Sequence, residues 1–231
     1  MYTINKITTN LQRLFLSGTL MLGMILSAGL FASCSEDDAA TEEFSGWQSK
    51  NDTYWKNLYN ETQRKIAAGD NSWEIILNYS YQNQQGSDGK APVYSPDQYV
   101  IVHKLENGTG SGTPLYTDTA FVHYQGRLIP SVTYTSGLVF DASWGSETYN
   151  PQTSRPRKIT LGGVASESNP VSGDGFSTAI QKMHIGDHWT VYIPYQLGYG
   201  ASALDKIPAY SNLIFDVRLH SYRRAGKKMP N

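Results

Sequence analysis

The segment 213–222 alternates between apolar and polar side chains, and this alternation constrains the fold more than any other feature. The apolar positions are Leu213, Phe215, Val217 and Leu219, and the polar positions are Asp216, Arg218 and His220. Successive side chains of a strand point to opposite faces, so the pattern predicts a strand with one face in the core and one in water. Half-buried strands of this kind are typical of antiparallel sheets.

Five other segments are rich in the β-branched, aromatic and aliphatic residues that favour strands. They span residues 73–81, 99–105, 120–126, 157–161 and 188–193. One helix is expected among the later strands, over residues 175–183, because apolar side chains recur there at helical spacing. These side chains are Phe176, Ala179, Ile180 and Met183. The pattern predicts a β-rich domain with a single short helix.

An earlier helix is expected over residues 51–68, where an apolar stripe repeats every three or four residues. The stripe consists of Trp55, Leu58, Tyr59, Thr62 and Ile66. Asn51 or Asp52 is expected to cap the start of this helix, and Gly69 stands where a helix commonly ends. The stripe is too short for a coiled coil, so it predicts a face that docks on the main domain, with a dimer seam as the alternative.

Length and charge limit the classes of protein to which the chain can belong. With 231 residues it can hold one domain or two small ones. Its 19 basic and 20 acidic residues nearly balance, so we expect no nucleic-acid partner. The final segment, 223–231, contains Arg223, Arg224, Lys227 and Lys228 and is interpreted as a solvated basic tail.

Residues 1–33 have the features of a secretory signal peptide. Lys6 and Arg13 precede an uncharged apolar run over 14–33, and the run ends at Cys34, the only cysteine of the chain. This ending resembles a bacterial lipobox, in which the cysteine is lipidated and becomes the first residue of the mature protein. A transmembrane anchor is the alternative, since about 20 apolar residues can span a bilayer. We therefore expect attachment to a membrane through lipid on Cys34.

The acidic residues directly after Cys34 bear on location. Residues 35–38, Ser-Glu-Asp-Asp, are similar to the tag that sends some lipoproteins of the Bacteroidota to the outer face of the outer membrane. A solvated linker is the alternative. We expect a lipid-anchored outer-membrane protein, with the periplasmic face and the cell surface both left open. Residues 34–46 are interpreted as a tether, and residues 47–97 as an N-terminal extension of helix and strand.

Four short motifs follow one another in the second half of the chain. They are Phe-Val-His-Tyr-Gln-Gly-Arg-Leu at 121–128, Gly-Leu-Val-Phe-Asp-Ala-Ser at 137–143, Ile-Pro with Gly-Tyr-Gly-Ala between 193 and 201, and Leu-Ile-Phe-Asp-Val-Arg-Leu at 213–219. In this order and at these spacings they resemble the FKBP-type peptidyl-prolyl cis-trans isomerases over residues 98–222. The resemblance implies an α+β fold, in which a twisted antiparallel sheet wraps on one short α-helix.

The same resemblance implies an activity, the acceleration of X–Pro isomerisation during the folding of extracytoplasmic proteins. Proline-containing polypeptides would be the substrates, no cofactor is implied, and macrolide inhibitor binding is left open. Rotation about the amide has a barrier of about 18–20 kcal/mol, and the uncatalysed step takes on the order of tens of seconds. Because no bond breaks, this chemistry needs an apolar aromatic cavity and well-placed donors rather than a nucleophile.

By resemblance, seven residues form the prolyl pocket. They are Tyr124, Phe140, Asp141, Phe176, Tyr199, Ile207 and Phe215. The aromatic rings would form the cavity, the Tyr199 hydroxyl and the Ile207 N–H would donate to the substrate, and Asp141 would act as the electrostatic partner. Taken singly, the aromatic residues could be ordinary core residues, and Asp141 could cap a turn or pair with Arg157.

Several positions depart from the family pattern. Phe176 stands where the family usually has a tryptophan, and Arg157 stands near a position that is often aromatic. Residues 129–136 and 163–174 are insertions that border the presumed cleft, so they could shape or obstruct it.

Other functions have less support in the sequence. His184 and His188 have the spacing of metal ligands on a helix, but Gly186 and Asp187 break a helix between them, so no metal site is expected. Two rivals to the enzyme remain. One is a peptide-binding or chaperone module of the same fold with little turnover, and the other is a structural component of an envelope assembly.

Overall fold

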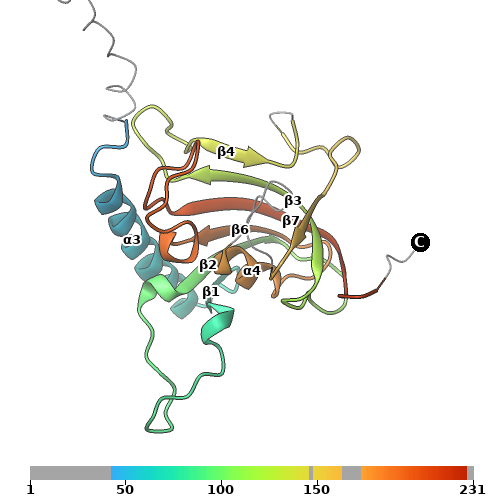
Figure 1. Ribbon diagram of the computed structural model, residues 1–231, viewed down its shortest axis with the longest axis horizontal. Coiled ribbons are helices and arrows are strands. Elements are labelled where there is room, and N and C mark those ends of the chain that lie inside the picture. Colours follow the sequence, from blue (N-terminus) through green and yellow to red (C-terminus); the bar gives the residue numbers. More distant parts are fainter. Residues whose placement is uncertain (1–42, 146–147, 163–172, 228–231) are drawn as a thin grey trace, which may run out of the picture. The chain divides into compact units, whose positions relative to one another are not determined.

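The computed structural model describes residues 43–145, 148–162 and 173–227 (Figure 1). The expected signal peptide 1–33, Cys34 with its acidic neighbours, and nearly all of the insertion 163–174 lie outside the described residues. Among the helices that are described, none combines the length and the apolar character that crossing a bilayer requires.

Seven strands of the described chain form one antiparallel sheet. They are β1 (Trp73–Leu77), β2 (Tyr99–Glu106), β3 (Thr119–Leu128), β4 (Val139–Ala142), β5 (Arg157–Thr160), β6 (His188–Ile193) and β7 (Leu213–Arg223). Their spatial order is β1-β2-β6-β7-β3-β4, and β5 pairs with β3. All six strands expected from sequence are present, and β4 is an additional short strand that the residue pattern did not predict. The α+β fold class is confirmed.

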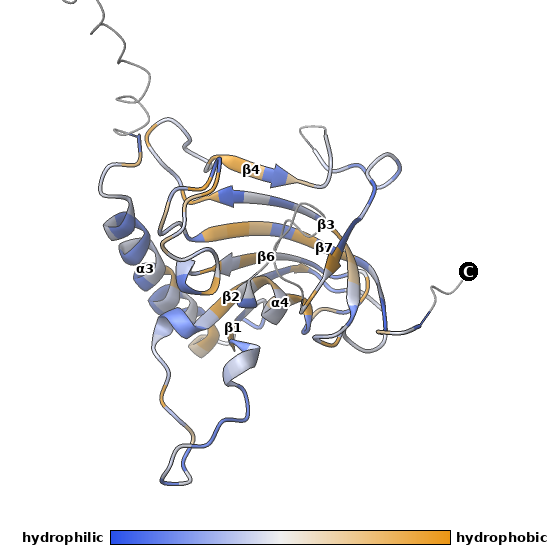
Figure 2. Cartoon of the chain, in the orientation of Figure 1, coloured by the Kyte–Doolittle hydropathy of each residue, from blue (hydrophilic) through white to orange (hydrophobic). Residues whose placement is uncertain are grey.

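The alternation in β7 produces the two faces that the sequence predicts. Phe215, Val217 and Leu219 are buried, while His220 is exposed. Ile214, on the other face, is also buried. Helix α3 (Trp47–Ala67) is bonded to Ser211 and Asn212, directly before β7. Figure 2 shows that hydrophobic residues gather along β2 and β7. Burial of this apolar surface drives the folding of the domain.

The second helix, α4 (Asp174–Ile180), packs on the face of the sheet that carries Phe215 (Figure 1). Every α4 residue from Gly175 to Ile180 is buried. Gly175 allows the close approach, because a Cβ at this position would lie 2.3 Å from Ile193 Cγ2. The helix is shorter than the expected 175–183, since the residues after Ile180 form a turn. It still brings Phe176 to the centre of the core.

Helix α3 begins at Trp47, four residues before the expected start. Its buried residues are Trp47, Asn51, Trp55 and Thr62. The expected capping role of Asn51 or Asp52 is wrong, because both residues lie inside the helix. The predicted stripe is only partly buried, with Ile66 40% exposed. The expected docking on the main domain is confirmed. The ring centre of Tyr59, a residue of the stripe, lies 6.0 Å from that of Tyr99 in β2. Trp55 and Lys65 contact the extension itself, through the Pro96 carbonyl oxygen at 3.0 Å and the Trp73 ring at 4.0 Å.

Candidate active site

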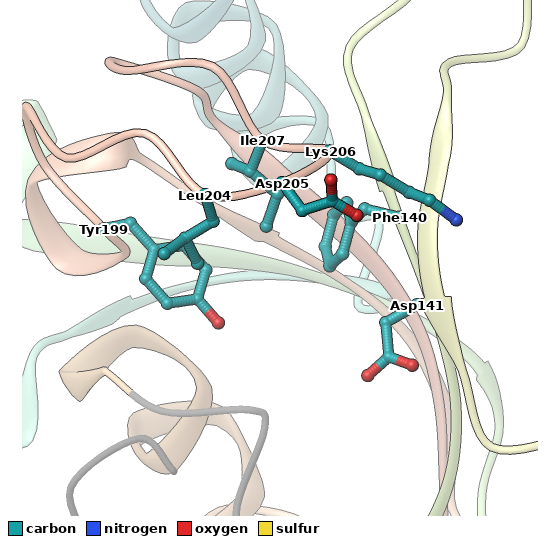
Figure 3. Close-up of a pocket in the computed structure, with 7 residues that line it drawn as sticks. All are labelled: Phe140, Asp141, Tyr199, Leu204, Asp205, Lys206 and Ile207. Carbon is teal, nitrogen blue, oxygen red and sulfur yellow. The ribbon is translucent and has the colours of Figure 1, made fainter. Parts of the chain in front are cut away.

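A pocket of about 180 Å³ opens between β4 and the segment 199–207 (Figure 3). It is lined by Phe140, Asp141, Tyr199, Leu204, Asp205, Lys206 and Ile207. Drug-sized ligands occupy pockets of about 300–1,000 Å³, so this pocket suits a single small ring or side chain. Figure 3 shows the side chains of Phe140, Asp141 and Tyr199 around one common space, with the Asp205 carboxylate above it.

Four of the seven residues predicted from the sequence line this pocket, and the other three lie beneath it. Tyr124, Phe176 and Phe215 are at most 1% exposed. The Phe215 ring centre lies 5.2 Å from that of Phe176 and 5.5 Å from that of Phe140, both in edge-to-face geometry. Tyr124 also meets Phe176 and Phe215 edge to face. Phe215 therefore connects the aromatic core to the pocket wall, and each such pair contributes about 0.5–1.5 kcal/mol.

The pocket residues Leu204, Asp205 and Lys206 were missed by the sequence reasoning. They lie in an irregular segment, where no periodic pattern reveals which side chain faces a cavity. The one signal available was their position directly before Ile207, which the family resemblance did identify. The two charged members give the pocket rim a polarity that the aromatic residues alone would not have.

Asp141 lines the pocket and is hydrogen-bonded to the buried Tyr124 side chain. The Tyr124 hydroxyl donates to the Asp141 carboxylate, and Arg157 Nη1 lies 3.6 Å from Asp141 Oδ2 and 3.4 Å from the Tyr124 hydroxyl oxygen. Burial, together with this hydrogen bond to Asp141, raises the pKa of Tyr124, so its hydroxyl stays protonated and keeps donating. Asp141 thus lines the pocket and also pairs with Arg157, the contact that the sequence offered as an alternative.

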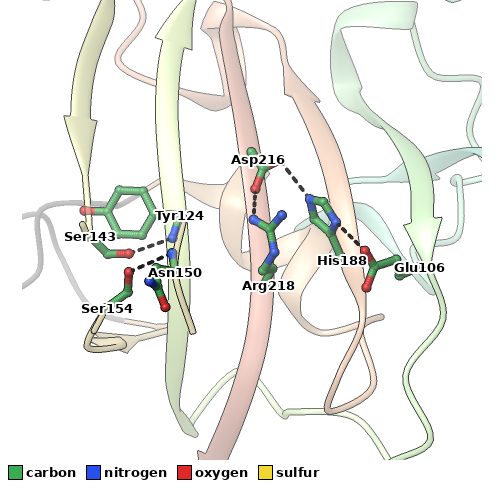
Figure 4. A network of polar contacts seen from close by, with 8 residues as sticks. All are labelled: Glu106, Tyr124, Ser143, Asn150, Ser154, His188, Asp216 and Arg218. Atoms are coloured by element: carbon green, nitrogen blue, oxygen red, sulfur yellow. Dashed lines mark hydrogen bonds and ion pairs between the residues drawn. The ribbon is translucent and has the colours of Figure 1, made fainter. Parts of the chain in front are cut away.

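Pairing between β3 and β4 sets the position of Asp141. Tyr124 N–H donates to Ser143 Oγ at 2.9 Å, and Ser143 N–H returns a bond to the Tyr124 carbonyl oxygen at 2.8 Å (Figure 4). In this register Asp141 lies opposite Gly126. The two motifs 121–128 and 137–143 therefore act together, one supplying the floor and the other the wall of the pocket.

Gly126 is required by this close pairing. A Cβ on Gly126 would lie 2.4 Å from Phe140 Cζ and 2.7 Å from Phe215 Cε1. Gly126→Ala is therefore expected to displace both rings and to lower the free energy of unfolding by about 1–3 kcal/mol, as overpacking does. Gly145→Ala is the matched control, because nothing lies within 4 Å of a Cβ there. Urea unfolding of both variants checks the prediction, and equal midpoints would contradict it.

The two expected hydrogen-bond donors differ in their surroundings. Tyr199 lines the pocket and is partly buried against the core. The Ile207 N–H donates to the Leu204 carbonyl oxygen at 3.2 Å, and the Leu204 N–H donates to the Ile207 carbonyl oxygen at 2.8 Å. A substrate carbonyl would have to share or replace the bond from Ile207. The donor roles of Tyr199 and Ile207 stay predictions.

A second hollow of about 390 Å³ lies on the other face of the sheet, over β3, β6 and β7. His188 Nε2 lies 2.8 Å from Asp216 Oδ2 and its Nδ1 lies 3.5 Å from Glu106 Oε1, while Arg218 also pairs with Asp216 (Figure 4). His184 points elsewhere, with Nδ1 3.8 Å from Asp187. Within residues 43–145, 148–162 and 173–227, no group of three or more His, Cys, Asp or Glu side chains is arranged so that it could hold a metal ion.

His123 lines the same hollow and makes stability depend on pH. Burial, and then the neighbouring His220 and Arg218, lower the pKa of His123. The folded state therefore favours the neutral ring, and we expect stability to fall as the pH drops below about 6.5, the unfolded value. His123→Phe keeps the ring contacts with Tyr149 and His220 but cannot titrate. Thermal unfolding between pH 7 and 5 should show a flatter profile for this variant, and an identical slope would contradict the assignment.

Comparison with known proteins agrees with this geometry. The model of the FKBP-type peptidyl-prolyl cis-trans isomerase family matches residues 110–220. The macrophage infectivity potentiator of Trypanosoma cruzi is 35% identical over 129 residues, 55% of this chain and 55% of that protein. The FKBP-type 22 kDa peptidyl-prolyl cis-trans isomerase of Escherichia coli (strain K12) is 30% identical over 131 residues, 56% and 53% of the two chains.

Among solved structures, a peptidyl-prolyl cis-trans isomerase from Pseudomonas syringae pv. tomato covers 73% of this chain and 96% of its own, with 24% identity and a TM-score of 0.42. The chain spans about half the length of the curated relatives it matches. The segment over residues 110–220, with its antiparallel strands, short helix and aromatic pocket, is similar to the FKBP-type peptidyl-prolyl cis-trans isomerase family. Helix α3, β1 and β2 precede the matched residues.

Proposed function

We propose that this protein is a peptidyl-prolyl cis-trans isomerase that accelerates X–Pro isomerisation in the folding of extracytoplasmic proteins. The observation that carries the proposal is the small pocket walled by Phe140, Tyr199 and Ile207 over a floor of buried aromatic rings. Its size suits one prolyl ring. The match of the family model to the segment that supplies every one of these residues gives independent support.

The mechanism follows from the chemistry of the amide. The planar amide owes its stiffness to resonance, and the twisted transition state loses that resonance. An apolar cavity that removes water and holds the prolyl ring, with donors placed for the twisted form, lowers the barrier without covalent chemistry. A 10⁴-fold acceleration requires about 5 kcal/mol. Hydrogen bonds to charged groups supply about 1.5–3 kcal/mol each, so Asp141 and the donors, together with desolvation, are sufficient.

A peptide-binding module with little turnover is the second candidate. It is favoured by one observation, the bond from the Ile207 N–H to Leu204, which occupies an expected donor. Such a module would hold proline-containing or hydrophobic segments of unfolded proteins without accelerating rotation. The third interpretation, a structural component of an envelope assembly, would need neither binding nor turnover at this pocket.

Refolding of a protein whose slow phase is limited by prolyl isomerisation tests the enzyme proposal. The full chain should shorten the slow phase in proportion to its concentration. Tyr199→Phe should weaken this acceleration. Tyr94→Phe is the matched control and should leave it unchanged, because it removes a hydroxyl in the extension that donates to the Tyr81 carbonyl oxygen. Peptide binding without any change of the slow phase would indicate the binding module. A macrolide inhibitor added in the same assay shows whether the pocket accepts that class of ligand.

We further propose that the protein is a lipoprotein of the outer membrane, held through lipid on Cys34. The support is the apolar run before Cys34 and the acidic residues after it, which are similar to lipoproteins of the Bacteroidota. Metabolic labelling with palmitate should mark the full chain and should fail with Cys34→Ser. Protease treatment of intact cells then distinguishes the cell surface, where the protein is cleaved, from the periplasmic face, where it is protected.

A further inference from the structure

The first two turns of α3 are bonded to the segment 208–212, which follows the pocket residue Ile207. The Trp47 indole N–H donates to Ser211 Oγ at 2.7 Å. Asn51 makes two bonds with Asn212: its Oδ1 accepts the backbone N–H at 2.8 Å, and its carbonyl oxygen accepts the side-chain amide at 2.7 Å. All four side chains are at most 5% exposed. Buried bonds of this kind are costly to break, because each leaves an unsatisfied polar group.

These contacts extend to both ends of the pocket segment. Asn212 Oδ1 accepts the N–H of Tyr195, four positions before Tyr199, at 2.9 Å. Ser211 Oγ donates to the carbonyl oxygen of Pro208, directly after Ile207, at 2.6 Å. The segment between these anchors supplies five of the seven pocket residues. Helix α3 is thus tied through Ser211 and Asn212 to both ends of the chain that forms most of the pocket.

The residues directly after Pro208 adopt a conformation that needs such support. Tyr210 has φ 62°, in the left-handed region that bulky residues rarely adopt. Its N–H donates to the Gly200 carbonyl oxygen at 2.8 Å, and its ring meets that of Tyr195 edge to face at 5.5 Å. Strained backbone of this kind persists only where the surroundings enforce it. Ser211 and Asn212, the next two residues, are the ones that α3 holds.

We propose that α3 is a positioning element of the pocket, in which Trp47 and Asn51 hold Tyr199 and Ile207 in place. Both residues precede the segment that the family model matches, so this device is added to the domain from the N-terminal extension. The effect on turnover rests on the proposed isomerase function. The effect on the order of the segment 199–207 does not. A misplacement of about 1 Å at a catalytic group can cost about 100-fold in rate, so such support has a large consequence.

Three variants of the full chain test the proposal. Asn51→Ala removes the side-chain acceptor that holds the backbone of Asn212, and Trp47→Phe removes the indole donor to Ser211 while keeping an aromatic ring. Trp55→Phe is the matched control, because it deletes an indole hydrogen bond of the same helix whose acceptor is Pro96. Amide hydrogen exchange of peptides covering residues 199–207 reports the order of the segment. The kcat/KM on a prolyl peptide reports its use in catalysis.

We expect exchange over 199–207 to become about tenfold faster in Asn51→Ala, less so in Trp47→Phe, and to stay unchanged in Trp55→Phe. The kcat/KM should fall in the same order, and the loss from Tyr199→Phe should shrink when Asn51→Ala is already present. If Asn51→Ala fails to fold, the exchange rates of Trp47→Phe and Trp55→Phe over 199–207 test the proposal instead. Equal exchange in those two variants would overturn the proposal. If the wild type shows no turnover, the isomerase function fails, and the exchange data still decide the positioning role.

Discussion

Truncation of Phe215 to alanine is expected to lower the free energy of unfolding by about 3–5 kcal/mol, the range for a fully buried phenylalanine. Phe215 is 1% exposed and its ring is in edge-to-face contact with Phe140, Phe176 and Tyr124. Its loss would leave a cavity at the junction of core and pocket. Domains have only about 5–15 kcal/mol of stability in total, so this loss removes a large fraction of it.

Two further variants make this prediction specific. Phe215→Leu keeps most of the volume and should cost less, while still removing the ring that supports Phe140. Phe121→Ala is the comparison on the same sheet, because Phe121 is only partly buried, and its truncation should cost clearly less. Urea unfolding followed by circular dichroism measures all three. If Phe215→Ala lowered the free energy of unfolding by less than about 1 kcal/mol, the proposed contribution of this ring to the core would be wrong.

Replacement of Asp141 with asparagine is expected to lower kcat/KM by about 10- to 100-fold, within the range for removal of a single charged or polar contact in a site. The carboxylate accepts the hydrogen bond of the buried Tyr124 hydroxyl and pairs with Arg157, so an amide would lose the charge and disturb both partners. Its side chain also faces the pocket. The fold should persist, since Phe140 and Phe215 stay in contact.

Two other variants separate the causes of this loss. Asp205→Asn removes a negative charge from the same pocket without touching Tyr124 and should have a smaller effect. Tyr124→Phe removes the hydroxyl and keeps the ring, so it shows how much of the Asp141 effect passes through this bond. Steady-state kinetics with a prolyl peptide measure each variant. Equal rates for Asp141→Asn and the wild type would remove Asp141 from the mechanism.

The sequence predicted the parts of the fold that rest on local pattern. The alternation of 213–222 and the apolar spacing of Phe176, Ala179 and Ile180 predicted β7 and α4, because burial of one face dictates these periods. It did not predict β4, which has only four residues and an exposed Val139 at its start. Nor did it predict the start of α3, since Trp47 and Asn51 are fixed by partners more than 160 residues away in the sequence.

The candidate site was likewise predicted in part, since its residues were identified but their hydrogen bonds were not. The family resemblance named Phe140, Asp141, Tyr199 and Ile207, and the structure gathers these four around one pocket. It did not indicate that the Tyr124 hydroxyl donates to Asp141, or that the Ile207 N–H donates to the Leu204 carbonyl oxygen, because both bonds depend on the three-dimensional path of the chain. Local pattern and motif therefore identified the residues, and the tertiary contacts determine their hydrogen bonds.

The central claim, that this pocket accelerates rotation about an X–Pro bond, is tested most directly by the cis–trans exchange rate of a short prolyl peptide. Magnetisation-exchange NMR measures this rate with catalytic amounts of the full chain. Without catalysis the exchange takes on the order of tens of seconds. We predict that the rate rises in proportion to the concentration of the wild type and that Asp141→Asn removes most of the increase. A rate that stays at the uncatalysed value while the peptide binds would contradict the claim.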